Sequence, residues 1–437
     1  MEAYSNHEGL YFVYGSGGTG KTYLWNTLIA KFRSDKKIIL SIASSGIAAL
    51  FLLGGRTAHS RFKIPLDPDN SSCYSINQGT GLARLIQEAS LIIWDEAPMV
   101  SRHAFEAVDR TFRDILKNTE HCSEDRDFGG KLFVLGGDFR QILPIVPRGG
   151  REQTVEASLP NSTIWKHCQV LHLTKNMRVT AQDISNHMLH ELRDFAEWIK
   201  LVSEGKIMGS SFSEGYEPKW IQIPEKMVIK NGERDLHQLI DATYPDFINK
   251  YQDMSYLKER GILAPKNSVV DEINSIILSM LPGEMKTFNS ANKLCPTESK
   301  KLKVGTPIML LRNVNQSLGL CNGTRLIVDK MRNRVIEARV ITGSRVGEKV
   351  LLSHIHSPFT MNSNKVAMTI NKSQGQTLKN VGLYRPNPVF SHGQLYIALS
   401  RVTSLSSLKL LVIDKQGIPD DVTKNVVYIE VFSGIDQ

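Results

Sequence analysis

The sequence predicts an α/β protein with two units built on parallel sheets and a small antiparallel β-barrel inserted in the second unit. Three observations support this: a glycine-rich loop between an apolar run and a helical segment, strand and helix patterns that alternate along most of the chain, and short β-type runs between residues 301 and 358. Alternating strands and helices form a parallel sheet covered on both faces. Short runs separated by Gly, Asn and Arg are typical of a small antiparallel barrel.

The 437 residues give room for two or three domains, and 41% hydrophobic and 22% charged residues are ordinary values for a globular protein. No apolar run is long enough to span a bilayer, and the first eight residues lack a basic leader and an apolar signal core. Five cysteines are scattered without a Cys-x-x-Cys pair, at positions 73, 122, 168, 295 and 321. We therefore expect reduced thiols in a nuclear or cytosolic protein, nuclear if the source is eukaryotic.

Positive charge is concentrated in the last third of the chain. The net charge is +9; residues 301–437 hold 18 Lys and Arg against 8 Asp and Glu, whereas the first hundred residues hold 9 against 8. Such a distribution fits a surface that binds a polyanion, and a merely solvated basic face is the alternative reading.

The first chemical signal is a glycine-rich loop between the apolar run Leu10–Tyr14 and a helical segment that starts at Tyr23. Its residues match the phosphate-loop pattern G-x-x-x-x-G-K-[ST], and they are Gly15-Ser16-Gly17-Gly18-Thr19-Gly20-Lys21-Thr22. Backbone N–H groups in such a loop surround phosphate, Lys21 reaches the β- and γ-phosphates, and the Thr22 hydroxyl binds Mg²⁺. The loop therefore predicts a nucleoside triphosphate site, with a turn that binds nothing as the alternative.

Two further strands of this unit end in polar side chains. The apolar run from Leu91 ends in Asp95 and Glu96, and we expect Asp95 to hold Mg²⁺ and Glu96 to act as general base toward the attacking water. After the strand 131–135, Gln141 is placed to hydrogen-bond the γ-phosphate. A second acid beside the first favours a hydrolase over a nucleotide kinase, which does not need it.

Another strand, 37–42, leads through a small-residue turn to the segment Gly54–Phe62, which mixes glycine, hydroxyls, bases and an aromatic ring. This composition suits a loop that contacts phosphates and stacks a base, although a plain loop is almost as good a reading of the segment alone. A helix over 104–116 lies between the strand that starts at Leu91 and the strand 131–135.

The second α/β unit is expected to begin near Ile164, with a strand at 170–174 that leads to Arg178 and a helix over 187–200. A strand at 261–265 and a helix over 269–277 follow, and the β-type runs of the barrel come next. Strand and helix patterns return at residues 367–377, whose base, amides and hydroxyls suit phosphate contact. A helix over 393–404 then leads to Arg401, in a position that suits an ATP sensor. A surface arginine at a helix end is the alternative.

Taken together, these segments resemble the Pif-type family of superfamily 1 DNA helicases, which are relatives of the RecD helicases. The resemblance runs from Gly15 to about Ile413 and rests on many motifs in the family's order: the phosphate loop, Ser44 to Phe62, Asp95 to Met99, Gly136 to Pro144, Leu173 to Arg178, Leu320 to Arg325, Met368 to Thr377, and Ala398 to Ser404.

The resemblance implies two RecA-like lobes of the P-loop NTPase class with ATP between them, and single-stranded or forked DNA as partner. The lobes would be 1–160 and 161–300 with 359–437, and the inserted barrel would be 301–358. It also implies ATP-driven 5′-to-3′ translocation with Mg²⁺ in DNA repair, recombination, replication and telomere maintenance. By matching motif, Gln141, Arg178 and Arg401 would touch the γ-phosphate. Residues in DNA-contacting motifs are Thr57, His59, Thr369, Lys372 and Gln374.

Two departures from the family pattern affect these expectations. Only fourteen residues precede Gly15, too few for the helix with a glutamine motif that reads adenine in the family, so we expect an N-terminally truncated relative. The segment 359–365, before Ala367, is also shorter than in relatives. The alternative functions are a degenerate DNA-binding P-loop ATPase with weak or no unwinding and an ATPase that acts on protein, against which the basic last third argues.

Overall fold

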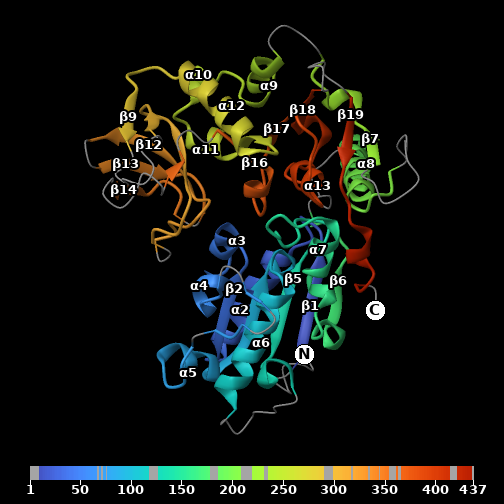
Figure 1. Cartoon of the computed structure of the whole chain (residues 1–437). Coiled ribbons are helices and arrows are strands. Elements are labelled where there is room, and N and C mark those ends of the chain that lie inside the picture. Colours follow the sequence, from blue (N-terminus) through green and yellow to red (C-terminus); the bar gives the residue numbers. More distant parts are fainter. Residues whose placement is uncertain are drawn as a thin grey trace. The chain divides into compact units, whose positions relative to one another are not determined.

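The computed structural model describes residues 9–65, 68–69, 72–74, 76–117, 126–177, 186–207, 219–230, 235–289, 299–315, 318–332, 335–343, 345–353, 361–362, 366–413 and 421–435. The chain divides into two compact units (Figure 1). Unit 1 is Met1–Asp183 with Tyr428–Gln437, and unit 2 is Ile184–Val427. No helix in the described part of the chain is long and apolar enough to cross a membrane.

Unit 1 contains a six-stranded, all-parallel sheet in the order β3-β2-β4-β5-β1-β6. Alternate side chains of β4 point to opposite faces, so that Trp94 joins one core cluster and Ile93 the other. The strands are β1 (Leu10–Gly15), β2 (Ile38–Ala43), β3 (Arg56–Thr57), β4 (Ala89–Asp95), β5 (Phe133–Gly137) and β6 (Gln169–Leu173).

Helices cover both faces of this sheet, as the alternating pattern predicts. Buried residues of α2 and α3 belong to one core cluster, and those of α4, α5 and α6 belong to the other. Three of these helices begin at a hydroxyl residue whose oxygen accepts a backbone N–H: Ser45, Thr80 and Ser101. The helices are α2 (Lys21–Ser34), α3 (Gly46–Phe51), α4 (Ala58–Phe62), α5 (Gly81–Glu88), α6 (Arg102–Leu116) and α7 (Arg151–Glu156).

The boundary between the units differs from the one expected at residues 160 and 161. Strand β6 pairs with β1, from Tyr11 opposite Gln169 to Gly15 opposite Leu173, so it completes the first sheet instead of opening the second. The C-terminal segment from Tyr428 also belongs to unit 1, although residues 359–437 were expected in the second lobe. Sequence periodicity identifies a strand but does not indicate which sheet it joins.

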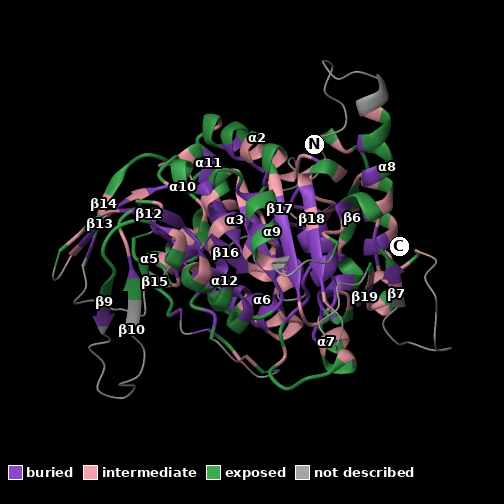
Figure 2. Cartoon of the chain, turned by 90° about the horizontal axis from the view of Figure 1, so that it is seen from above, coloured by how far each residue is buried: buried purple, intermediate pink, exposed green. Residues whose placement is uncertain are grey.

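Unit 2 contains a four-stranded parallel sheet in the order β16-β8-β17-β18. Its strands are among the most buried segments of the unit (Figure 2). Residues of α9 and α12 share a core cluster with them. The elements of this part are α8 (Asn186–Ser203), α9 (Asp235–Thr243), α10 (Phe247–Lys250), α11 (Met254–Lys258), β8 (Arg260–Ala264), α12 (Asn267–Met280), β16 (Ala367–Thr369), β17 (Asn380–Arg385), α13 (Gln394–Leu399), β18 (Leu408–Val412) and the antiparallel pair β7 (Lys219–Gln222) and β19 (Val422–Asn425).

Between α12 and β16 the chain forms antiparallel sheets with a core of their own, in which Ile308, Leu326 and Ile336 are buried. The larger sheet has the order β14-β13-β12-β11-β15, and β9 pairs with β10. These strands are β9 (Lys286–Asn289), β10 (Ser299–Leu302), β11 (Pro307–Leu310), β12 (Arg325–Met331), β13 (Val335–Val340), β14 (Lys349–Ser353) and β15 (Met361–Asn362). The insertion is thus a separate β subdomain of unit 2.

Candidate functional site

The carboxyl ends of the strands in unit 1 bring the first group of predicted residues to one edge of the sheet. The glycine-rich loop leaves β1 at Gly15, Asp95 ends β4, and Gly137 ends β5 opposite Tyr14. Parallel sheets bind ligands outside the carboxyl ends of their strands, because loops and helix N-termini converge there. This edge is therefore the candidate site.

The glycine-rich loop has the backbone that a phosphate-binding loop needs. Gly18 and Gly20 adopt φ values of 93° and 90°, which favour glycine, and Gly20 directly precedes α2. The Thr19 hydroxyl donates to Ser16 O at 2.9 Å, which closes the loop. The Lys21 ammonium donates to Gly15 O and to Ser16 O, so this cation lies over the loop.

Asp95 is a buried carboxylate beside a cation. Its side-chain oxygen Oδ1 accepts no hydrogen bond from the residues that the structure describes. Burial raises the pKa of the Asp95 carboxyl, and the Lys21 ammonium and the Trp25 indole oppose this rise. A buried oxygen of this kind, with the exposed Thr22 hydroxyl on the first turn of α2, fits Mg²⁺, which takes one or two protein ligands plus phosphate oxygens and waters. The described residues contain no group of three His, Cys, Asp or Glu suited to a metal.

Glu96 follows in a left-handed backbone conformation, with φ 54° and ψ 37°, and is 9% exposed. Non-glycine residues rarely adopt this conformation, and such strain is concentrated at functional sites. The 3₁₀ turn Ala97–Met99 that follows packs against β5, because a Cβ at Gly137 would lie only 2.3 Å from Pro98 Cδ. The glycine at the end of β5 therefore allows the turn that orients Glu96.

Gln141 is held by a buried acidic residue that the sequence did not single out. Asp138 accepts from the backbone and side-chain nitrogens of Arg140 at 3.1 and 2.9 Å, and Gln141 Nε2 lies 3.4 Å from Asp138 Oδ2. The Arg140 guanidinium also lies over the Tyr14 ring, 5.2 Å from its centroid. Gln141 Oε1 is buried and accepts no hydrogen bond from the described residues.

The first group of predicted DNA contacts lies at the end of β3, next to β2. Thr57 pairs in register with Ala43, and His59 follows on α4. Burial lowers the pKa of His59, so its ring is neutral at pH 7. Burial and the neighbouring Arg56 lower the pKa of Arg61, so two guanidinium groups lie close together here, as they do where phosphate is the counterion.

The second group lies on unit 2, where β16 runs into the 3₁₀ turn η9 (Ile370–Ser373). Thr369 ends the strand, Lys372 is half-buried on the turn, and Gln374 is 4% exposed. Burial lowers the pKa of Lys372, and the carboxylate of Asp271 opposes this. When a phosphate binds beside a desolvated lysine of this kind, its negative charge stabilises the charged ammonium.

Arg401 lies after α13 in unit 2 and is 5% exposed. Its guanidinium donates to backbone oxygens of its own unit. Arg178 lies outside the described residues. The structure therefore brings Lys21, Asp95, Glu96 and Gln141 together on unit 1, while contact of either arginine with a γ-phosphate stays a prediction. Sequence reasoning missed Trp25, Asp138 and Arg140; the glycine pair Gly136-Gly137 was the available signal of close packing.

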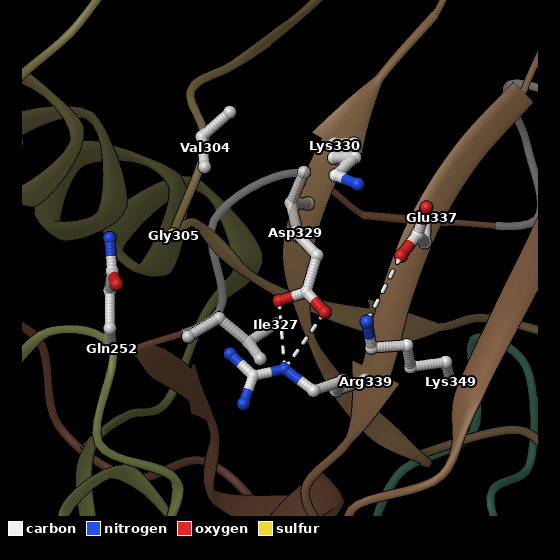
Figure 3. Close-up of a pocket in the computed structure, with 10 residues that line it drawn as sticks. Gln252, Val304, Gly305, Ile327, Asp329, Lys330, Glu337, Arg339 and Lys349 are labelled. Atoms are coloured by element: carbon white, nitrogen blue, oxygen red, sulfur yellow. Dashed lines mark hydrogen bonds and ion pairs between the residues drawn. The ribbon is translucent and has the colours of Figure 1, made fainter.

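A cavity of about 290 Å³ lies elsewhere, on the inserted sheet of unit 2 (Figure 3). Arg339 Nε donates to both oxygens of Asp329 at 2.8 Å, and Lys349 Nζ lies 3.6 Å from Glu337 Oε1. Because these charges pair with one another across β12, β13 and β14, the cavity does not offer the phosphate chemistry of the unit 1 edge.

Comparison with known proteins shows what the chain as a whole is similar to. The family model "PIF1-like helicase" matches residues 1–212, and the model "DNA helicase Pif1, 2B domain" matches residues 289–331. The second match covers β9 to β12 and so falls on the inserted β subdomain.

Among curated proteins, the chain is 26% identical to the ATP-dependent DNA helicase Pif1 of Campylobacter jejuni, over 91% of this chain and 88% of that protein. It is also 26% identical to the human ATP-dependent DNA helicase PIF1, over 94% of this chain but 59% of the longer human protein. A crystal structure of Pif1 helicase from Bacteroides in complex with ADP-AlF3 and single-stranded DNA has a similar fold, with a TM-score of 0.66, 22% identity and 97% of both chains covered.

Proposed function

We propose that the chain is a member of the Pif1-like helicase family and acts as an ATP-dependent DNA helicase that couples ATP hydrolysis to movement along single-stranded DNA. The observation that supports this most directly is the group Lys21, Asp95, Glu96 and Gln141 at one edge of the unit 1 sheet. A phosphate loop, a buried metal-binding carboxylate, a second acid and a buried amide are the parts that γ-phosphate hydrolysis needs.

In this proposal Mg²⁺ is the cofactor, bound by Asp95 and Thr22, and it neutralises the charge of the phosphates when it is present. Glu96, which lies at the carboxyl edge of the sheet, accepts a proton from the attacking water. Lys21 binds the β- and γ-phosphates, and the Gln141 amide nitrogen, which leaves Asp138 for this contact, donates to the γ-phosphate. Arg178 and Arg401 complete the charge around the transferred phosphate.

Single-stranded and forked DNA are the proposed partners, with Thr57 and His59 in unit 1 and Thr369, Lys372 and Gln374 in unit 2 as contacts. Two DNA-binding segments on two units, with one nucleotide, are the minimum for stepwise translocation. We propose a role in DNA repair, recombination, replication and telomere maintenance, and a nuclear location if the source is eukaryotic.

The test is the ATPase rate with and without single-stranded DNA at saturating Mg-ATP. We expect stimulation of severalfold or more, and equal rates would refute a DNA-driven motor. Strand separation is then assayed on duplexes with a 5′ or a 3′ tail. Unwinding only from the 5′ tail is expected, and unwinding only from the 3′ tail would refute the proposed polarity. Stimulation without unwinding would identify a DNA-binding ATPase instead.

A further inference from the structure

Arg401 makes an unusually complete set of hydrogen bonds within unit 2. Its Nε donates to Ile397 O at 2.9 Å, and its Nη2 donates to the Ser400 hydroxyl at 2.9 Å. Its Nη1 donates to Ser373 O at 3.2 Å and to Gln376 O at 2.9 Å. A single guanidinium therefore joins the end of α13 to the turn that follows β16.

The turn that Arg401 contacts is the predicted DNA-contacting segment of unit 2. Residues 370–376 carry Lys372, and Thr369 directly precedes them. Gln376 N also donates to Ser373 O, so residues 373–376 form a tight turn. Two carbonyl groups of this turn, those of Ser373 and Gln376, accept hydrogen bonds from one cation. Charge-assisted hydrogen bonds are the stronger ones in proteins, and the rigid fork of arginine suits two acceptors at once.

Other hydrogen bonds also hold this segment, among them Ser373 Oγ to Ile370 O at 2.7 Å and Gln374 N to Asn371 O at 3.4 Å. Leu378 N donates to Arg401 O at 2.9 Å, and Gln376 Nε2 donates to Lys372 O at 3.1 Å. Gly375 adopts φ 78°, which lets the backbone turn back between the two carbonyls that Arg401 binds. The guanidinium and a glycine therefore both contribute to the conformation of the segment.

We infer that Arg401 is a positioning residue that holds residues 370–376 in their DNA-binding conformation before any nucleotide binds. This inference rests on the proposed function and goes beyond an arginine that only senses ATP. A pure sensor acts when the γ-phosphate is present, whereas a residue that shapes the DNA segment also acts in its absence. The two roles therefore differ in the DNA affinity of the nucleotide-free protein.

The experiment measures binding of a fluorescent oligo(dT) strand to the nucleotide-free full chain by anisotropy. Arg401→Lys keeps the charge but cannot bridge two carbonyls with a planar fork, and we expect at least a tenfold loss of affinity. Lys258→Ala, which removes one exposed positive charge of unit 2, is the control and should stay within twofold of the unchanged protein. Affinity of Arg401→Lys within twofold of that control would overturn the inference.

A second variant reaches the same turn without touching the arginine. Gly375→Ala places a Cβ on a residue with positive φ and should raise the DNA concentration that half-saturates the ATPase at least fivefold. The KM for ATP and the rate at saturating DNA should change less than twofold, whereas partial unfolding would lower the rate and leave the half-saturating concentration unchanged. A lower rate at saturating DNA with an unchanged half-saturating DNA concentration would contradict a positioning role.

Hydrogen exchange separates failure of this inference from failure of the proposed function. If the unchanged protein does not bind DNA, the proposed function fails, but the positioning role still predicts faster exchange of the Gln376 and Leu378 amides in Arg401→Lys. Unchanged exchange at both amides would refute the positioning role whatever the protein does with DNA.

Discussion

Replacing Gly136 by alanine tests the packing between the unit 1 sheet and the helix that begins at Lys21. A Cβ at Gly136 would lie 2.3 Å from Cζ2 and 3.1 Å from Cη2 of Trp25, well inside the ~3.5–4.0 Å at which carbon atoms touch. The indole is fully buried in the core cluster on this face, so it cannot move away freely. Overpacking of this kind costs about 1–3 kcal/mol of unfolding free energy.

The same substitution should affect the nucleotide site, because the Trp25 indole lies beside the carboxylate of Asp95. We expect Gly136→Ala to lower both the unfolding free energy, measured in urea by circular dichroism, and the affinity for a fluorescent ATP analogue with Mg²⁺. Gly81→Ala is the matched control, since a Cβ there meets nothing within 4 Å, and it should be neutral or stabilising by up to about 1 kcal/mol. If Gly136→Ala were as stable as Gly81→Ala, the packing argument would be refuted.

Three further predictions concern the chemistry of the site. Glu96→Gln keeps the size of the side chain but cannot accept the water's proton, so steady-state turnover should fall ~10²–10⁴-fold with ATP binding retained; near-normal turnover would remove Glu96 from the role of base. Burial raises the pKa of Asp95, so the folded state prefers the neutral acid, and its contribution to stability is lost as pH rises through the folded pKa. Asp95→Asn should therefore raise the melting temperature at pH 7. This gain in melting temperature should disappear as pH falls toward 3.8, the pKa of the carboxyl in the unfolded chain, and a gain that stays constant across pH would contradict the argument. The same variant should also lose affinity for Mg-ATP. Lys372→Ala should weaken binding to all DNA sequences alike and reduce the salt dependence of the affinity, whereas an unchanged salt slope would remove Lys372 from phosphate contact.

The parts of the site that follow directly from strand ends could be predicted from the sequence. An apolar run that ends in two acids places Asp95 and Glu96 at the carboxyl edge of a sheet, because parallel strands share that edge. The phosphate loop was recognisable for a similar reason, since the order strand, glycine-rich turn and helix is local in sequence. Residue spacing reflects the elements that are neighbours in the sequence.

Contacts between distant residues could not be predicted in this way. The indole of Trp25 fits against Gly136 and beside Asp95, yet these residues are separated by 111 and 70 positions in the chain. The sequence showed an aromatic residue on an apolar helix face, which is consistent with any core position. The hydrogen bonds of Arg401 are similar, because nothing in residues 394–404 indicates that the arginine donates to Ser373 O.

The C-terminal segment from Tyr428 makes contacts that the sequence did not predict, and they assign this segment to unit 1. Trp165 Nε1 donates to Gly434 O at 2.8 Å, and the Arg151 guanidinium donates to both oxygens of Glu430 at 2.9 and 2.8 Å. Val431 and Ile435 are buried in the unit 1 core. Because this segment belongs to unit 1, the polypeptide passes between the units twice, at residues 183–184 and at 427–428. A substitution near the described connection at 427–428 should therefore alter the coupling of the proposed ATPase to DNA without altering nucleotide affinity, which the ATPase rate with and without single-stranded DNA measures.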